Sequence, residues 1–190
     1  MQQLIAELEK RGYEAKLVTR EEAVTFVAAE MKKVASVGWG GSESVKEIGL
    51  RELAAAEGLE IREHRTDAEL FLLSANALLT DGRIVNIDGN GNRIAASIFG
   101  PKKVIYVIGR NKIVSGGLDD AIARIRAEAC PPNAKRLGRK TPCGLTGKCC
   151  DPTGFGCRSE GRMCKVTAVF EMPPTHTPTT VLLVDEKLGF

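Results

Sequence analysis

The feature of this sequence that most constrains its fold is a regular alternation between continuous apolar runs and amphipathic helical segments. The apolar runs have the length and the β-branched content of buried strands, as in "VASVG", "KKVIYVIG" and "TVLLVDE". Segments with helical spacing, such as "REEAVTFVAAEMKK" and "NRIAASIFG", lie between them. Strands that are apolar along their whole length are typical of parallel sheets covered on both faces. We therefore predict an α/β fold with a mostly parallel sheet covered by helices.

The same pattern gives the boundaries of the elements that follow. Residues 41–58 predict one helix, and residues 59–64 predict the strand after it. Residues 69–89 predict strands around an Asp-Gly turn. Residues 118–129 predict a helix that ends at Pro131 and Pro132, because proline interrupts a helix interior. Two further strands are expected toward the C-terminal end of the sequence.

Composition limits the number of domains and the kinds of partner. With 190 residues, of which 43% are hydrophobic, the chain is long enough for one core, so we expect a single domain over residues 1–190. The net charge of +3 is modest and spread along the sequence, so nucleic acid is not an expected partner. The opening "MQQLIAELEKRGYEAK" contains no long apolar run, so we expect no signal peptide, no membrane span and a cytoplasmic location.

The cysteines are concentrated in one segment, residues 138–164, which is rich in glycine and poor in large apolar side chains. Five of the six cysteines lie there, Cys130 lies just before, and residues 1–129 have none. A reducing cytosol and this clustering argue against a disulfide framework. The spacings match neither zinc fingers nor the bacterial ferredoxin run. Four thiolates from a flexible loop can still hold zinc or an iron–sulfur cluster; a redox disulfide and simple reduced thiols are the alternatives.

A glycine-rich turn between a predicted strand and a predicted helix is the first candidate binding site. It consists of "SVGWGGSES" and includes Gly40, Gly41, Ser42 and Ser44. Glycines allow close approach to the backbone, and free amides at a helix start attract anions such as phosphate or carboxylate. A plain strand-to-helix turn capped by Ser42 explains the same residues equally well. The turn fits neither the P-loop nor the dinucleotide-binding pattern, and we find no flavin or NAD motif.

Short polar residues at the ends of the next predicted strands form the second candidate site. They include Asn86, Asp88 and Asn90. Open α/β sheets bind their ligands in a crevice at such strand ends. Asp88 could act as a general base or orient a substrate hydroxyl, or it could close an Asx turn.

Four stretches together carry a resemblance to a known family. They are "SVGWGGSESVKEIG", "SANALLTDGRIVNIDGNGNRIAASIFGPKKVIYVIGRNKIV", "PPNAKRLGRKTPC" and "VLLVDEKLGF". From about residue 36 to its end, the chain resembles the LUD (lactate utilisation) domain family, in particular the small members that lack ferredoxin motifs. The resemblance implies a fold like that of ribose-5-phosphate isomerase, glucosamine-6-phosphate deaminase and the CoA transferases. It also implies that Gly40, Gly41, Ser42 and Ser44 receive an anion, and that Asn86, Asp88 and Asn90 face the same crevice.

The resemblance also implies a function. Family members are tied to bacterial growth on lactate beside iron–sulfur oxidoreductase subunits, which makes this chain a subunit of an electron-transfer system that oxidises lactate or a related hydroxyacid. The family's cysteine pattern corresponds to Cys143, Cys149, Cys157 and Cys164, with Cys150 as a possible substitute, and these would hold a 4Fe-4S cluster or zinc. The alternative is a stand-alone enzyme or sensor that binds a small phosphorylated or carboxylated metabolite, with structural zinc in the cysteine loop.

Overall fold

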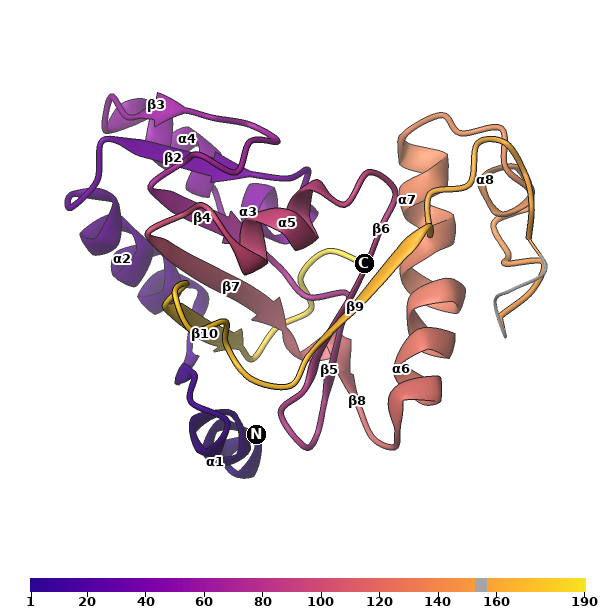
Figure 1. Cartoon of the computed structure of the whole chain (residues 1–190), viewed down its shortest axis with the longest axis horizontal. Coiled ribbons are helices and arrows are strands. Elements are labelled where there is room, and N and C mark those ends of the chain that lie inside the picture. The colour runs from indigo at the N-terminus through magenta and orange to yellow at the C-terminus, as the bar shows by residue number, and fades with distance from the viewer. Residues whose placement is uncertain (153–156) are drawn as a thin grey trace.

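Six parallel strands form the central sheet in a computed structural model that describes residues 1–152 and 157–190 (Figure 1). Every neighbouring pair of these strands runs parallel. Their order is β1 (Glu14–Val18), β10 (Thr179–Val184), β7 (Lys103–Gly109), β4 (Leu70–Leu73), β2 (Ser36–Trp39) and β3 (Glu60–Ile61). The predicted α/β class with a mostly parallel, helix-covered sheet is confirmed.

Helices cover both faces of this sheet because successive strand residues point to opposite sides. Leu70 and Leu72 belong to one buried cluster, and Phe71 and Leu73 belong to another. The first cluster includes side chains of α2 (Arg20–Met31), α3 (Glu43–Glu47) and α4 (Leu50–Ala56). The second includes side chains of α1 (Gln2–Lys10) and α5 (Asn92–Ile98). Two-sided burial explains why the strands are apolar at every position.

A second sheet lies between the central sheet and α6 (Leu118–Arg124) (Figure 1). Its order is β8 (Ile113–Val114), β5 (Ala77–Leu79), β6 (Ile84–Asp88) and β9 (Val166–Phe170). Leu78, Ile84 and Phe170 join the buried cluster of the central sheet on one side. On the other side, Leu79 and Val85 pack with residues of α6 and the turn after it. The strands predicted around the Asp-Gly turn are therefore β5 and β6, which pair antiparallel.

Two predicted elements differ in the structure, each for a local reason. The helix expected over residues 41–58 is divided into α3 and α4 at Gly49, whose left-handed backbone (φ 78°) interrupts the helical path. The strand expected over residues 59–64 is shortened to β3. The amides of Arg62 and His64 still donate to the carbonyls of Val37 and Trp39, but the left-handed backbone of His64 (φ 60°) ends the extended conformation.

The prediction that Pro131 and Pro132 end a helix is wrong. After α6 the chain makes one π-helical turn (Ile125–Ala129) and continues into α7 (Cys130–Arg136). The prolines lie in the first turn of α7, where their missing N–H groups are tolerated. The helical path therefore extends to residue 136 before α8 (Pro142–Thr146) begins. In the part of the chain that the structure describes, no helix is long and apolar enough to cross a membrane.

Candidate functional site

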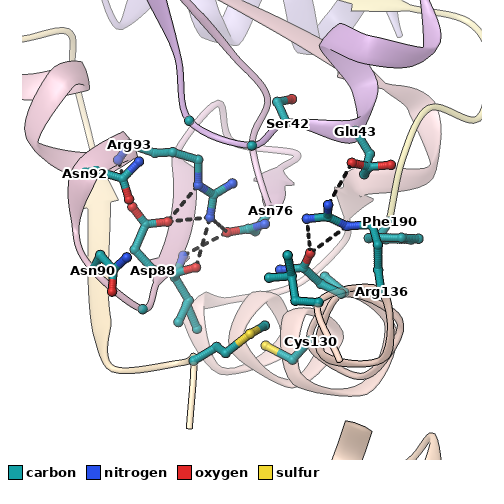
Figure 2. Close-up of a pocket in the computed structure, with 18 of the residues that line it drawn as sticks. Ser42, Glu43, Asn76, Asp88, Asn90, Asn92, Arg93, Cys130, Arg136 and Phe190 are labelled. Atoms are coloured by element: carbon teal, nitrogen blue, oxygen red, sulfur yellow. Dashed lines mark hydrogen bonds and ion pairs between the residues drawn. The ribbon is translucent and has the colours of Figure 1, made fainter. Parts of the chain in front are cut away.

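A crevice of about 620 Å³ lies where the chain leaves the carboxyl ends of three neighbouring central strands. The turn after β2 supplies Gly40–Ser44, the segment after β4 supplies Ser74–Asn76, and the short 3-10 helix after β7 (Arg110–Lys112) supplies Lys112. Side chains of α7 line the opposite wall (Figure 2). Open α/β sheets bind their ligands at such strand ends, and a crevice of this volume has the size of a small-molecule site.

The predicted glycine-rich turn lines this crevice, and it also has features of a plain turn. Gly40 faces Arg93 so closely that a Cβ atom at residue 40 would lie 2.3 Å from the Arg93 Cγ. Gly41 has a left-handed backbone (φ 72°). The Ser42 hydroxyl accepts a hydrogen bond from the Val45 amide at 3.4 Å and so caps α3. The Ser42 cap is the one expected of a plain strand-to-helix turn, and anion binding by the turn stays a prediction.

Asp88 lines the crevice but has both carboxylate oxygens engaged. Its Oδ2 accepts hydrogen bonds from the backbone amides of Arg93 and Ile94, each at 3.1 Å. Its Oδ1 accepts from Nε of Arg93 at 2.8 Å and from Nη2 of the same guanidinium. Asp88 thus anchors the start of α5 and orients Arg93 (Figure 2). The general-base role stays a prediction, because a base must have an oxygen within reach of a substrate proton.

The two predicted asparagines have different positions. Asn90 lines the crevice, whereas Asn86 is fully buried and is not one of the lining residues. The Asn86 side chain accepts a hydrogen bond from the Asn76 amide at 2.8 Å. The Asn76 side chain in turn accepts from Arg93 Nη2 at 3.1 Å (Figure 2). Asn86 therefore supports the wall. Asn76, which was not among the predicted site residues, reaches the crevice.

Lys112 is a crevice residue that the sequence analysis missed. Its side chain is only 4% exposed, and its Nζ donates to Ser44 Oγ at 2.9 Å and to Ser74 Oγ at 2.8 Å. Burial, followed by the positive charges of Arg124 and Arg93, lowers the pKa of Lys112 to about 7. In the sequence, Lys112 follows the apolar strand "KKVIYVIG", and this position was the only signal that it could lie near the site. Nothing in its neighbouring residues distinguishes it from a surface lysine.

All six cysteines line a second, much smaller cavity of about 20 Å³ between α7 and the cysteine segment. The thiols of Cys130 and Cys164 are hydrogen-bonded, and so are those of Cys150 and Cys157. The bond from Cys130, together with the nearby Arg162, lowers the pKa of the Cys164 thiol. The Cys143 thiol lies 3.3 Å from the hydroxyl of Thr141, the residue that caps α8.

The cysteine segment as predicted covers residues 138–164, and residues 153–156 of it lie outside the described residues. Of the described residues, no group of three His, Cys, Asp or Glu side chains is arranged to hold a metal ion as it stands. The structure adds one thiol to the predicted set: α7 brings Cys130 to Cys164, although 33 residues separate them in the sequence. Cys130 is the first residue of α7, next to Pro131.

The two cavities share a wall. Cys130, Arg162 and Met163 line both of them, and Figure 2 shows Cys130 at the edge of the crevice. Arg162 holds the cysteine segment in place, because its guanidinium donates to the backbone carbonyls of Cys157 at 2.6 Å and Cys164 at 2.9 Å.

Positive side chains outnumber acidic ones around the crevice. The acidic residues are Glu43, Glu63, Asp88 and Glu160, and the basic ones are Arg51, Arg93, Lys112, Arg136, Arg139, Arg162 and Lys165. Glu43 forms an ion pair with Arg136 of α7 at 3.2 Å, which connects the two walls (Figure 2). The excess positive charge favours an anionic ligand.

Together these features define an α/β protein with a predominantly basic crevice beside a cysteine-lined cavity. The LUD domain family model matches residues 1–184, so the chain belongs to the LUD domain family, which is associated with lactate utilisation. The solved structure of a DUF162 family protein from Deinococcus radiodurans has the same fold. It is 14% identical in sequence, with a TM-score of 0.56 over 96% of this chain and 94% of that one. No curated protein matches this chain.

Proposed function

We propose that this chain is a subunit of an iron–sulfur electron-transfer system that oxidises lactate or a related hydroxyacid. The crevice binds the carboxylate of the hydroxyacid or of its oxo-acid product, and the neighbouring cysteines hold a redox group. The observation that carries this proposal is the shared wall of Cys130, Arg162 and Met163. A redox group held by the cysteines would lie beside the ligand instead of in a separate part of the molecule.

The chain's own residues bind and orient the ligand. Arg93 is held by Asp88 and Asn76, so its guanidinium is fixed before a ligand arrives. Gly40 lies directly against the aliphatic part of the Arg93 side chain, so the glycine-rich turn and Arg93 are neighbours in the wall of the crevice. A fixed donor surface loses little conformational freedom when a carboxylate binds to it.

The donors beside the crevice suit an iron–sulfur cluster by their chemistry. Thiolates are the ligands that such clusters take, and six thiols line one cavity here. Cys143, Cys149, Cys157 and Cys164 would hold the cluster, and Cys150 is the possible substitute. A cofactor of a partner subunit would take the two electrons and two protons removed from the hydroxyacid, and a cluster at this position would pass the electrons on one at a time.

The size of the cysteine-lined cavity favours a second candidate function. About 20 Å³ is room for one water-sized particle, which is closer to a single zinc ion than to a cluster. In this case the cysteine segment is structural. The crevice then belongs to a stand-alone enzyme or sensor that binds a small phosphorylated or carboxylated metabolite.

Metal analysis with visible absorption, on protein purified without oxygen, tests the proposal. We expect iron and sulfide with visible absorption in the wild type, and their loss in Cys149→Ser and Cys164→Ser. Cys150→Ser distinguishes the two ligand sets, because it should retain the metal if Cys149 is the ligand and lose it if Cys150 is the substitute. Zinc alone would favour the second candidate, and full metal content in both single variants would exclude the predicted ligands.

A further inference from the structure

Lys112 differs from an ordinary buried lysine in its partners. A lysine that is almost completely buried is normally paired with a carboxylate, because an isolated charge is costly to remove from water. Within the described residues, the Lys112 amine has two serine hydroxyls as hydrogen-bond partners and no carboxylate within 4.0 Å. These hydroxyls, Ser44 and Ser74, follow β2 and β4 and line the crevice. The described residues place no negative charge next to the Lys112 amine, so a bound anion would supply it.

The charges around Lys112 come from three other elements. Arg93 of α5 and Arg124 of α6 disfavour the protonated amine, and Glu47 of α3 favours it. All three groups have other partners. Arg93 is paired with Asp88, Arg124 is paired with Glu128 at 3.5 Å, and Glu47 accepts a hydrogen bond from the Gly189 amide at 2.7 Å. Burial adds to the effect of the two arginines, so the pKa of Lys112 falls to about 7 and a large fraction of the amine is neutral near neutral pH.

We propose that Lys112 is the charge-compensating residue of the crevice and that it takes up one proton when a carboxylate or phosphate binds beside Ser44 and Ser74. The proton comes from solvent and converts the amine to an ammonium, and no covalent bond to the ligand forms. The physical reason is that an opposite charge within a few ångströms stabilises the charged form of a lysine. This inference rests on the proposed function, because it requires an anionic ligand in the crevice.

The proposal determines the direction of the pH dependence. Below the pKa of Lys112 the amine is already charged, so an anion binds without proton uptake and with full affinity. Above that pKa, binding must be accompanied by protonation, so affinity falls as pH rises. With a pKa of about 7, we expect affinity to be about tenfold weaker at pH 8 than at pH 6.

Calorimetry with L-lactate, pyruvate and inorganic phosphate tests this, with each titration in two buffers that differ in ionisation enthalpy. The wild type should take up nearly one proton per bound anion at pH 8 and much less at pH 6. Lys112→Met should lose at least tenfold in affinity at pH 6. Lys112→Arg keeps a permanent charge, so it should bind with no proton uptake and little pH dependence. Lys46→Met, an exposed change on α3, is the control and should behave as the wild type.

The outcomes separate this inference from the proposed function. Lactate or pyruvate binding without proton uptake, or uptake that persists in Lys112→Arg, overturns the role of Lys112 and leaves the hydroxyacid proposal in place. Binding of phosphate alone, with a proton uptake that is smaller by one proton in Lys112→Arg at pH 8, supports Lys112 but contradicts the hydroxyacid proposal. The comparison with Lys112→Arg is needed because phosphate itself titrates near neutral pH. No binding of any of the three anions overturns both. If Lys112→Met fails to fold, the wild type and Lys112→Arg still decide the question.

Discussion

Asp88 holds Arg93 at two places, because its carboxylate accepts hydrogen bonds from both the backbone amide and the guanidinium of the same residue. Only 2% of the Asp88 side chain and 16% of the Arg93 side chain are exposed. The pair therefore ties the start of α5 to the wall of the crevice. From the sequence, Asp88 was the candidate general base. In the structure, its carboxylate supports the Arg93 guanidinium.

Removal of this carboxylate should destabilise the protein. Asp88→Ala leaves the buried Arg93 guanidinium without its counter-charge, and such a loss costs about 3–5 kcal/mol of unfolding free energy. Urea denaturation measures the change. Asp185→Ala removes an exposed ion pair to Arg110 and should have no measurable effect. Similar stability of the two variants would mean that Asp88 is not a structural anchor and would strengthen its predicted role as a base.

Lys112 should give the protein a pH-dependent stability that disappears in Lys112→Met. The pKa of Lys112 is about 7 in the folded protein and about 10.4 in an unfolded chain. Between these values the unfolded chain binds more protons, so the free energy of unfolding rises with pH by roughly 1.4 kcal/mol per unit. Below pH 7 both states carry the charge, and this stabilisation is lost.

Urea denaturation of the wild type and Lys112→Met at several pH values between 6 and 10 isolates this contribution, because other titrating groups cancel in the difference. A difference that does not change with pH would show that Lys112 keeps its charge in the folded protein.

Gly40→Ala should weaken anion binding without unfolding the protein. The new methyl group would lie 2.3 Å from the Arg93 Cγ, so the guanidinium must move away from the turn. We expect at least a tenfold loss of affinity for L-lactate or pyruvate by calorimetry, with unchanged circular dichroism. Gly117→Ala meets nothing closer than 4.0 Å, lies outside the crevice and provides the control. Equal affinity in both variants would remove the glycine-rich turn from the binding surface.

Removal of metal should make the cysteine segment sensitive to protease before the rest of the chain. Residues 138–164 contain few large apolar side chains, so a bound group is expected to supply most of their stability. After chelation under reducing conditions, trypsin should cleave first after the exposed Lys148 and Arg158. Mass spectrometry identifies the cuts. Cleavage that is equally fast before and after chelation would show that no metal orders this segment.

The sequence alone was sufficient for the fold class because its signals are local and repeated. Continuous apolar strands alternate with helices, and only a sheet buried on both faces satisfies that pattern. The position of the glycine-rich turn was also predictable, because residues that follow parallel strands gather at one edge of the sheet. Asn90 lines the crevice too, but it follows β6 of the second sheet, whose neighbours run antiparallel, so that rule does not account for its position. The path through Pro131 and Pro132 was not predictable by the same rules, since a π-helical turn places them in a new first turn.

The tertiary structure alone decided which side chains meet. Lys112 and Ser44 are 68 residues apart and share a hydrogen bond, and Cys130 of α7 meets Cys164 in the cysteine-lined cavity. Asn86 and Asp88 lie two residues apart on one strand, yet only Asp88 lines the crevice. Burial and partners of this kind depend on the whole packed chain. The sequence could therefore locate the crevice, but only packing could show which charges it contains and that a cysteine-lined cavity adjoins it.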